Sequence, residues 1–435
     1  MKIAILGYGI QGRSAFEYWN RDGNGITICD RNDDLKLPEH VGSQLGLDYL
    51  NNLDDFDLIV RSPNVHPNDI VSANSASILA KVTTPTNEFM SVCPTKNVIG
   101  VTGTKGKGTT SSLITTILEM NGKTVHLGGN FGISPLDLLK KGIAAEDWVV
   151  LELANFQLVD LKTDPHIAVC LMIAPEHLDW HTDMDEYVES KSQLFVHQNP
   201  DDIAVYYAKN DNSKLIASKG QAKKIPFFEK PGAVVEDGEF KIDGKSICAT
   251  SEIKLLGEHN WQNVAAAITA TWQISQDVQK LRAALLNFKS LDNRLELVRE
   301  IDGVKYYNDS FGSAPDATVA AIKAIPGTKI IVIGGFDRNL PLQSLVDIIK
   351  VNSKDLRTIV LIGASSDRVS TELQQAGFSN FKLVDSKDMK EIVRQVRELA
   401  KHGDSVVLSP GFPSFDMFKN FEERGRQFRE VVNEL

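Results

Sequence analysis

The first residues that could do chemistry lie in a glycine-rich segment, Gly100–Thr110, with the sequence GVTGTKGKGTT. An apolar, β-branched run precedes it and a helix-periodic run follows it, so a strand, a turn and a helix are expected in that order. Glycines allow successive backbone N–H groups to point at one phosphate, and the N-terminus of the helix adds a positive dipole end. Lys107 would reach the outer phosphates, and the hydroxyl of Thr109 or Thr110 would hold Mg²⁺. The segment therefore predicts a loop that binds a nucleoside triphosphate.

A second glycine-rich segment, Gly7–Gly12, reads G-x-G-x-x-G directly after the apolar run Lys2–Leu6. A further strand is expected over Ile26–Cys29, and it ends in Asp30, where an acidic residue meets a ribose hydroxyl in dinucleotide-binding folds. Only about 90 residues precede the triphosphate loop, too few for both halves of a complete dinucleotide fold. The segment therefore predicts a half-sized unit that holds one nucleotide, such as the UDP of a substrate. Glycines that serve only tight helix–strand packing remain the alternative.

Two further groups follow predicted strands of the middle region. Glu152 ends the strand expected over Trp148–Leu151, where a magnesium-binding carboxylate of the Walker-B kind belongs. A buried or helix-capping acid is the alternative. His177 follows the strand expected over Ile167–Leu171, and the sequence pattern by itself leaves open whether it binds a ligand.

Composition limits the class of protein. The chain has 435 residues, enough for about three domains of ~150 residues. With 42% hydrophobic and 24% charged residues it is typical of a soluble globular protein, and a formal charge of −10 argues against wholesale nucleic-acid binding. No apolar run approaches ~18 residues and no signal peptide is evident, so no membrane insertion is expected. The four cysteines show no C-x-x-C spacing, which favours a reducing, cytoplasmic compartment.

The elements that must position these groups alternate between apolar strands and helices along the whole chain. Such alternation predicts an α/β fold with parallel sheets covered on both faces. Breaks in the pattern near Val92–Lys96 and Ser290–Glu296 divide the chain into residues 1–93, 94–293 and 294–435. A β-rich patch over Ala233–Ala249 is expected inside the middle domain, because Asp-Gly turns interrupt it.

Several stretches, in order and with matching spacing, resemble the motifs of the Mur ligase family, and within it the MurD type. They are GVTGTKGKGTT, HLGGNFG, LELANFQL, PEHLDWH, GEHNWQN, DNRLE, YNDS and LSPGFPSFDMFKNFEERGRQF. The resemblance covers nearly the whole chain. It implies three domains: an N-terminal Rossmann-like UDP-binding unit, a central P-loop ATPase-like parallel or mixed sheet with helices, and a C-terminal Rossmann-like domain that closes and brings the amino acid.

The resemblance also implies a reaction, the addition of glutamate to UDP-N-acetylmuramoyl-L-alanine in peptidoglycan precursor synthesis, and hence roles in cell-wall biogenesis, cell shape and cell division. The substrate carboxylate attacks the γ-phosphate of ATP to give an acyl phosphate. The amine of the incoming amino acid then attacks that carbonyl, and phosphate leaves. The partners implied are these small molecules, two Mg²⁺ ions and no nucleic acid, with the protein as a monomer.

Residue roles carry over from the family motifs onto matching positions. Lys107, Glu152, His177 and Lys191 are the implied catalytic residues; Thr109 and Glu152 would hold one Mg²⁺, and His177 with a carbamylated Lys191 the second. ATP would be bound by Gly103, Thr104, Lys105, Gly106, Lys107, Gly108, Thr109, Thr110, Asn260, Asn263, Arg294 and Asp309. The UDP substrate would meet Gly9, Ile10, Gln11, Asp30, Arg31, Ser62, Asn130 and Gln157. The amino acid would meet Ser313, Arg338, Ser414 and Phe421.

Departures from the MurD pattern leave alternatives open. Lys105 stands where asparagine is usual, and Gly108 in the run G-K-G-[ST] makes the ATP loop more like that of folylpolyglutamate synthetases, although the unit before the loop argues against such an enzyme. Phe311 stands where a lysine is usual, and Arg338 replaces another lysine but can bind a carboxylate with two parallel hydrogen bonds. Because the altered segment lies where stereochemistry would be read, the choice between D- and L-glutamate stays open. An NAD-dependent oxidoreductase and a nucleotide-switched binding protein are the competing classes.

Overall fold

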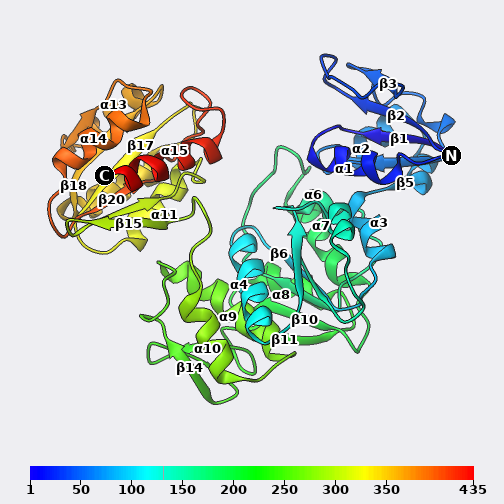
Figure 1. Cartoon of the computed structure of the whole chain (residues 1–435), viewed down its shortest axis with the longest axis horizontal. Coiled ribbons are helices and arrows are strands. Elements are labelled where there is room, and N and C mark those ends of the chain that lie inside the picture. Colours follow the sequence, from blue (N-terminus) through cyan, green and yellow to red (C-terminus); the bar gives the residue numbers. More distant parts are fainter. Residues whose placement is uncertain (131) are drawn as a thin grey trace. The chain divides into compact units, whose positions relative to one another are not determined.

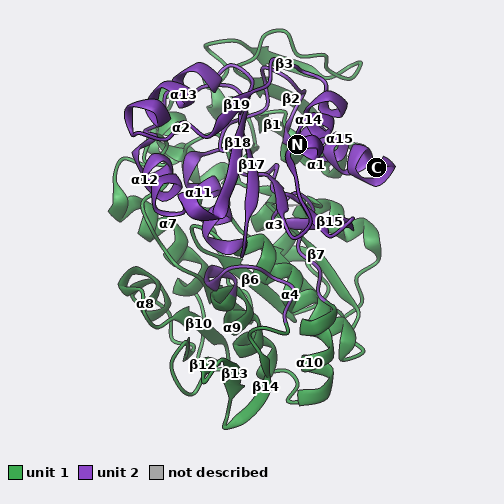
Figure 2. Cartoon of the chain, turned by 90° about the vertical axis from the view of Figure 1, so that its left-hand side faces the viewer, with its two compact units in different colours: residues 1–252, 261–287 green, residues 253–260, 288–435 purple. Residues whose placement is uncertain are grey.

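The computed structural model describes residues 1–130 and 132–435 (Figure 1). Contacts within the backbone divide it into two compact units, residues 1–252 with 261–287 and residues 253–260 with 288–435 (Figure 2). The α/β class expected from the sequence is confirmed, since helices alternate with largely parallel sheets in both units. The domain boundaries expected after residues 93 and 293 stay predictions.

The N-terminal part of the first unit is a five-stranded parallel sheet in the order β3-β2-β1-β4-β5. Its strands are β1 (Lys2–Leu6), β2 (Gly25–Asp30), β3 (Gly42–Leu45), β4 (Leu58–Arg61) and β5 (Val82–Thr83). Its helices are α1 (Ile10–Trp19), α2 (Pro67–Ala73) and α3 (Pro85–Val92), with the 3-10 turns η1 (Leu53–Asp55) and η2 (Ala76–Lys81). The strand order reverses at β1, so the loop after β1 lies at the switch point where α/β sheets bind ligands.

The central part of the same unit is a six-stranded parallel sheet in the order β11-β10-β9-β6-β8-β7. Its strands are β6 (Val98–Thr102), β7 (Val125–Gly129), β8 (Trp148–Glu152), β9 (Ile167–Cys170), β10 (Ile203–Tyr207) and β11 (Lys223–Phe227). Strands β6, β8 and β9 are buried at every position, which explains their continuous apolar sequences. Because β6 lies between β8 and β9, the segments that follow these three strands meet at one edge of the sheet.

Helices cover this sheet, and a small antiparallel sheet follows it. The helices are α4 (Lys107–Met120), α5 (Pro135–Leu138), α6 (Asn155–Leu158), α7 (Met184–Val196), α8 (Asp211–Ser218), α9 (Glu258–Trp272) and α10 (Val278–Asn287), with η3 (Leu139–Lys141). The antiparallel strands β12 (Val234–Glu236), β13 (Glu239–Ile242) and β14 (Lys245–Ala249) fall in the patch where Asp-Gly turns were expected. Helix α4 packs on β6, β7 and β8.

The second unit is a six-stranded sheet in the order β15-β16-β20-β17-β18-β19, parallel except for the β15–β16 hairpin. Its strands are β15 (Glu296–Ile301), β16 (Val304–Asn308), β17 (Lys329–Gly334), β18 (Leu356–Ile362), β19 (Phe381–Leu383) and β20 (Ser405–Leu408). Its helices are α11 (Pro315–Ala324), α12 (Gln343–Val351), α13 (Ser366–Gln375), α14 (Met389–Leu399) and α15 (Phe421–Glu434), with η4 (Ser353–Asp355). Separate apolar clusters fill its two faces, so it is a doubly covered sheet with its own core.

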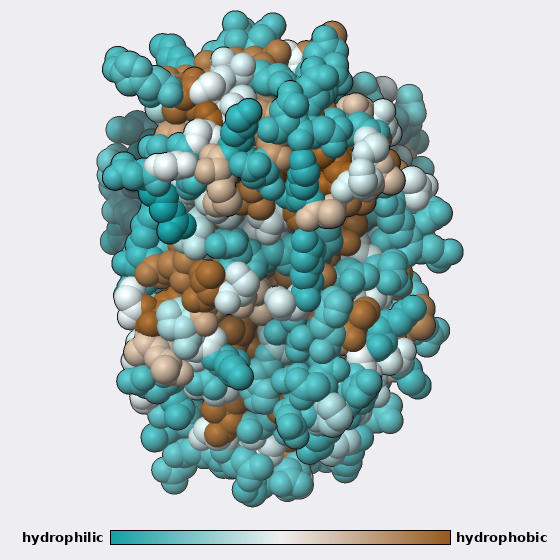
Figure 3. Space-filling model, turned by 90° about the vertical axis from the view of Figure 1, so that its right-hand side faces the viewer, coloured by the Kyte–Doolittle hydropathy of each residue, from teal (hydrophilic) through white to brown (hydrophobic). Residues whose placement is uncertain are grey.

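Hydrophilic side chains dominate the face of the molecule drawn in Figure 3, where the apolar residues form separated patches. Within residues 1–130 and 132–435, no helix is both long enough and apolar enough to cross a membrane.

Candidate active site

The triphosphate loop predicted from the sequence has the expected strand–turn–helix form. It joins β6 to α4, and Gly103 and Gly106 both have positive φ angles, 150° and 87°. A Cβ at Gly106 would lie 2.1 Å from Oδ1 of Asn263, and one at Gly103 would lie 2.7 Å from the Cβ of Leu171. The backbone curl and the close neighbours therefore both demand glycine at these two positions.

Two lysines converge on this loop from different helices. Nζ of Lys107, in the first turn of α4, donates to the carbonyls of Gly103 and Thr104, each at 3.0 Å. Nζ of Lys191, in α7, donates to the same Gly103 carbonyl at 3.1 Å and lies 4.6 Å from the ring centre of Tyr187. The sequence pattern alone would place Lys191 on a solvated helix face, yet its side chain is buried.

Burial and charge act together on Lys191. Desolvation holds its pKa well below the usual lysine range, and the neighbouring Lys107 lowers it further. The amine at this position is therefore held in its neutral, nucleophilic form much more readily than an exposed lysine.

The polar side chains of the loop and of the first turn of α4 differ in their contacts. The hydroxyl of Thr104 contacts the Tyr187 hydroxyl at 3.0 Å and the backbone of Ala174, so it fastens the loop to the segment after β9. Thr110 is fully buried and donates to Oδ1 of Asn263 at 3.4 Å. Lys105 is exposed and pairs with Glu176. Thr109, the implied metal ligand, lies in the first turn of α4 and is largely buried.

Glu152 lies where β8 ends, on the strand next to the loop. Oε1 of its carboxylate accepts a hydrogen bond from the side-chain amide of Asn130 at 3.1 Å, and its backbone carbonyl accepts the Asn130 N–H at 2.7 Å. Gly129 permits this approach, because a Cβ there would meet the Glu152 carbonyl at 2.1 Å. The acid expected to bind Mg²⁺ and one residue expected to meet the substrate are thus held together.

His177 follows β9 on the other side of the loop and has a positive φ of 57°. Its half-exposed ring packs 4.8 Å from the ring of Phe156. Burial lowers the pKa of its imidazole, and the positive charges of Lys107 and Lys191 lower it further. A neutral imidazole is the form that binds a metal ion.

One end of the Gln157 side chain has a structural role. Its Oε1 accepts the N–H of Ala154 at 3.1 Å and caps α6, whereas its buried Nε2 makes no hydrogen bond within the described residues. These amide hydrogens are the part of Gln157 that the expected contact with the substrate would use.

The N-terminal glycine loop also contains a glycine with a positive φ and a close backbone approach, but it has no lysine. Gly7 has a φ of 84°, and a Cβ at Gly12 would lie 1.9 Å from the Gly7 carbonyl. The carboxylate of Asp30 accepts the N–H of Tyr8 at 2.7 Å and that of Asn32 at 2.9 Å. Ser62 donates to the Gly7 carbonyl at 2.8 Å. Two of the residues expected to bind UDP thus also hold the loop in shape.

The side chains around the N-terminus of α1 differ in exposure. Ile10 is 78% exposed, which is unusual for isoleucine and suits contact with a ligand. Oε1 of Gln11 is buried and makes no hydrogen bond among residues 1–130 and 132–435. Gly9 and Arg31 are exposed.

The expected ligand contacts of the second unit surround the end of β16. Asp309 is buried, and burial raises the pKa of its carboxyl to about 7. Its two oxygens accept from the Leu295 N–H at 3.2 Å and the Ser409 hydroxyl at 2.7 Å. The guanidinium of Arg294 lies 3.7 Å from the ring centre of Phe311, which in turn packs edge-on against Phe421 at 5.1 Å.

The remaining predicted residues are spread over the same unit. Arg338 is exposed, Ser313 is half-buried, and the side chain of Asn260 donates to the Leu256 carbonyl at 2.7 Å. The hydroxyl of Ser414 is buried without a hydrogen-bond partner in the described part of the chain.

Sequence reasoning missed several residues that shape the first unit. Arg61 is fully buried and binds Asp160 through two hydrogen bonds of 2.8 and 2.6 Å, which ties β4 to the segment after α6. Tyr187 bridges the loop and Lys191. Neither role has a local signal, because Asp160 lies 99 residues from Arg61 and Thr104 lies 83 residues from Tyr187 along the chain.

Two family models match this chain: the Mur ligase middle domain over residues 101–271 and the Mur ligase glutamate ligase domain over residues 293–412. Among curated proteins, the UDP-N-acetylmuramoylalanine–D-glutamate ligase of Clostridium kluyveri is 33% identical, with 100% of this chain and 97% of that protein covered. The ligases of the same name from Clostridium acetobutylicum and Acetivibrio thermocellus are each 34% identical, with 100% and 96% covered.

Solved structures share the fold at lower identity. MurC of Thermotoga maritima, a UDP-N-acetylmuramate–alanine ligase, aligns with a TM-score of 0.61 at 16% identity, covering 100% of this chain and 99% of that one. MurF of Acinetobacter baumannii aligns with a TM-score of 0.63 at 15% identity, covering 99% and 90%. From the full-length relatives and the two matched domains, the chain belongs to the Mur ligase family, and within it to the UDP-N-acetylmuramoylalanine–D-glutamate ligase type.

Proposed function

We propose that this chain joins D-glutamate to UDP-N-acetylmuramoylalanine at the expense of ATP, as a step of peptidoglycan precursor synthesis. Relatives that carry this activity in their names match along their whole length. The observation that carries the proposal is the meeting of three segments: the glycine loop after β6, Glu152 at the end of β8, and His177 after β9. An oxidoreductase would have no use for this arrangement.

Lys107 and the N-terminus of α4 bind the outer phosphates of ATP. In the structure, Nζ of Lys107 donates to two carbonyls of its own loop, so it is held at the loop's mouth until phosphate oxygens replace them. Phosphoryl transfer depends mostly on positioning and on stabilising charge at the phosphoryl oxygens, which this lysine supplies. The substrate carboxylate attacks the γ-phosphorus, ADP leaves, and the glutamate amine then displaces phosphate from the acyl carbon.

The donor set fits Mg²⁺. Thr109 offers a hydroxyl and Glu152 a carboxylate, the oxygen ligands that this ion prefers. Bound Mg²⁺ would neutralise the phosphates, while Asn130 keeps the Glu152 carboxylate oriented. His177 with Lys191 would hold a second ion.

Lys191 fits this role only as a carbamate. An ammonium beside Lys107 would repel a cation, whereas reaction of a neutral amine with CO₂ produces a carboxylate and releases a proton. The burial that lowers the pKa of Lys191 favours that neutral amine. Its contact with the Gly103 carbonyl supports a position at the edge of the phosphate loop.

The N-terminal sheet receives the UDP moiety at its switch point, with Gly9, Ile10, Gln11, Asp30, Arg31 and Ser62 around it. Asn130 and Gln157 meet the muramoylalanine end, where Nε2 of Gln157 has no other hydrogen-bond partner among the described residues. In the second unit Arg338 binds a carboxylate of glutamate, with Ser313, Ser414 and Phe421 beside it. Asn260, Asn263, Arg294 and Asp309 complete the ATP contacts.

Two further assignments belong to the same proposal. All four cysteines are unpaired thiols, as a reducing cytoplasmic compartment requires. The protein works as a monomer of residues 1–93, 94–293 and 294–435, arranged as three domains.

Phosphate release tests this proposal. Purified protein is incubated with ATP, Mg²⁺, UDP-N-acetylmuramoyl-L-alanine and either D- or L-glutamate, and phosphate and product mass are measured. Turnover with D-glutamate alone is expected. Turnover with L-glutamate instead would overturn the stereochemical assignment, and no ADP with either enantiomer would overturn the function.

A further inference from the structure

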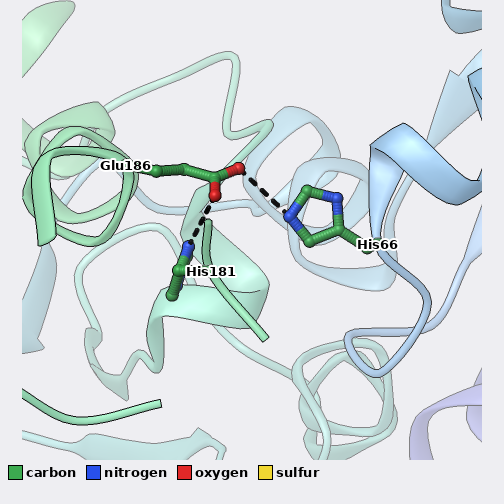
Figure 4. A group of neighbouring side chains, drawn as sticks. All are labelled: His66, His181 and Glu186. Carbon is green, nitrogen blue, oxygen red and sulfur yellow. Dashed lines mark ion pairs between the residues drawn. The ribbon is translucent and has the colours of Figure 1, made fainter. Parts of the chain in front are cut away.

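Three side chains that the proposed reaction does not use meet inside the first unit. His66 precedes α2, His181 lies in the segment between β9 and α7, and Glu186 lies in the first turn of α7. Figure 4 shows both imidazole rings directed at the carboxylate of Glu186. His66 and His181 are only 8% and 3% exposed, whereas Glu186 is partly open to solvent.

The ligand atoms of these residues lie close together. Nε2 of His66 is 3.1 Å from Oε1 of Glu186, and Nδ1 of His181 is 3.7 Å from Oε2. All three ligand atoms lie within 4.8 Å of one another, the one such group of His, Cys, Asp and Glu found within residues 1–130 and 132–435. Neither facing nitrogen makes a hydrogen bond of normal geometry in that part of the chain.

Aromatic rings pack against the two imidazoles, whereas the Glu186 carboxylate stays partly open to solvent. The ring of Trp180 lies 4.1 Å from that of His66 and 4.6 Å from that of His181, and Tyr187 packs against His181 at 5.4 Å. Two imidazole nitrogens and a carboxylate oxygen are a ligand set typical of zinc.

The distances are close to those that one metal ion requires. Two ligands bound tetrahedrally at about 2.1 Å from a metal lie about 3.4 Å apart, so a separation of 4.8 Å, the upper limit for this group, needs a closure of about 1.4 Å. The carboxylate of Glu186 must move to close this gap, and its Oε2 accepts hydrogen bonds from the N–H and the hydroxyl of Thr182 at 2.6 and 2.9 Å, which that movement has to share or replace.

The outer nitrogens of the two rings behave differently. Nε2 of His181 lies 2.8 Å from Nδ2 of Asn155, and turning that amide over would provide an oxygen to accept the ring N–H, as metal-bound histidines require. Nδ1 of His66 accepts the N–H of Asn68 at 3.0 Å, which places the ring proton on Nε2 in the absence of metal. Metal binding at Nε2 therefore moves this proton to Nδ1 and gives up the bond to Asn68.

We propose that His66, His181 and Glu186 bind one transition-metal ion of the zinc class, with a water molecule in the fourth position. The ion ties the turn after β4 to α7, the helix that also carries Lys191. It differs from the Mg²⁺ expected at Thr109 and Glu152, because two imidazole nitrogens favour zinc or cobalt whereas Thr109 and Glu152 offer only oxygen ligands.

Cobalt titration of the full-length protein tests this site without using ligase activity. Chelator-stripped protein in excess Mg²⁺ is titrated with Co²⁺, the visible absorption of the bound ion is recorded, and Zn²⁺ is added to displace it. One equivalent of tetrahedral Co²⁺ is expected. His66→Asn should weaken binding by about 100-fold or more, because changes even outside the ligand shell cost 10- to 100-fold. Asparagine is also a good cap for α2, so this variant keeps the helix start.

Control variants at other histidines show whether the Co²⁺ signal comes from this site. His126→Asn removes a mostly buried imidazole paired with Asp147, and it should bind Co²⁺ as tightly as the wild type. His177→Asn should also keep the signal, which separates this site from the expected magnesium site. Glu186→Gln provides a second ligand change if His66→Asn melts at a lower temperature. Equal Co²⁺ affinity in the wild type and both ligand variants, or no tetrahedral Co²⁺ in the wild type, would overturn the proposal.

Discussion

The first unit contains two glycine-rich loops that have similar tight backbone turns but are surrounded by different side chains. Each follows a strand inside a parallel sheet, and each contains a glycine whose Cβ would collide with a neighbour, Gly12 or Gly106. Around the N-terminal loop the polar groups are Asp30 and Ser62, which bond to the backbone. Around the central loop two lysines converge from different helices. The backbone shape therefore makes an anion site possible, and the side chains of neighbouring elements decide what reaction occurs there.

Removing Lys107 from the central loop should cause the largest loss of activity. Lys107→Ala removes the cation that donates to the loop's own carbonyls and leaves only the exposed Lys105, which pairs with Glu176, so turnover should fall about 1000-fold or more. Phosphate release measures the loss, and circular dichroism checks the fold. Lys123→Ala, an exposed lysine just after the same helix, is the control and should stay active. Near-normal turnover in Lys107→Ala would remove the loop assignment.

Replacing the buried lysine tests whether it acts as a carboxylate. Lys191→Ala should lower turnover about 100-fold, and acetate should restore part of it, because a small carboxylate can occupy the place of the carbamate. Activity is compared with and without acetate, with chloride at equal ionic strength as the control. No recovery in acetate, with the protein still folded, would count against the carbamate.

Replacing one glycine in each loop by alanine tests how tightly the neighbouring atoms constrain the two backbones. Gly106→Ala and Gly12→Ala should each lower the free energy of unfolding by about 2–3 kcal/mol, because the new Cβ overlaps fixed neighbours and Gly106 also has a left-handed φ. Urea denaturation measures both. Gly9→Ala is the control, because a Cβ added at Gly9 would have no atom within 4 Å other than those of its two chain neighbours. It should change the free energy of unfolding by less than about 0.5 kcal/mol. A loss at Gly9 equal to the others would contradict this steric account.

The smallest effect is expected at Asp30. Asp30→Asn keeps the shape of the side chain but weakens the two hydrogen bonds from backbone N–H groups, so KM for the UDP substrate should rise about 10-fold with kcat nearly unchanged. Initial rates at varied substrate concentration measure this split. An equal fall in kcat would mean that the N-terminal loop contributes to the chemical step.

Local sequence pattern was sufficient to predict most helices and strands and the positions of several candidate site residues. The run from β6 through the loop to α4 was predictable, since apolar periodicity, glycine spacing and Lys107 are contiguous. The positions of Glu152 at the end of β8 and of His177 after β9 were predictable because each follows an apolar run, and their roles as metal ligands stay predictions. Lys191 was identified only through family resemblance, since a lysine on a helix is normally exposed. His66, Arg61 and Glu186 carried no signal at all.

The amino-acid sequence by itself determined the strand–loop–helix order, the glycines that the two turns demand and the family to which the chain belongs. Only the tertiary structure decided that Lys107 and Lys191 donate to one carbonyl, that Lys191 is buried and readily neutral, and that His66 meets His181 and Glu186. The physical reason is that burial and charge depend on neighbours distant along the chain. Sheet order and helix packing bring these neighbours together, and no short stretch of sequence encodes them.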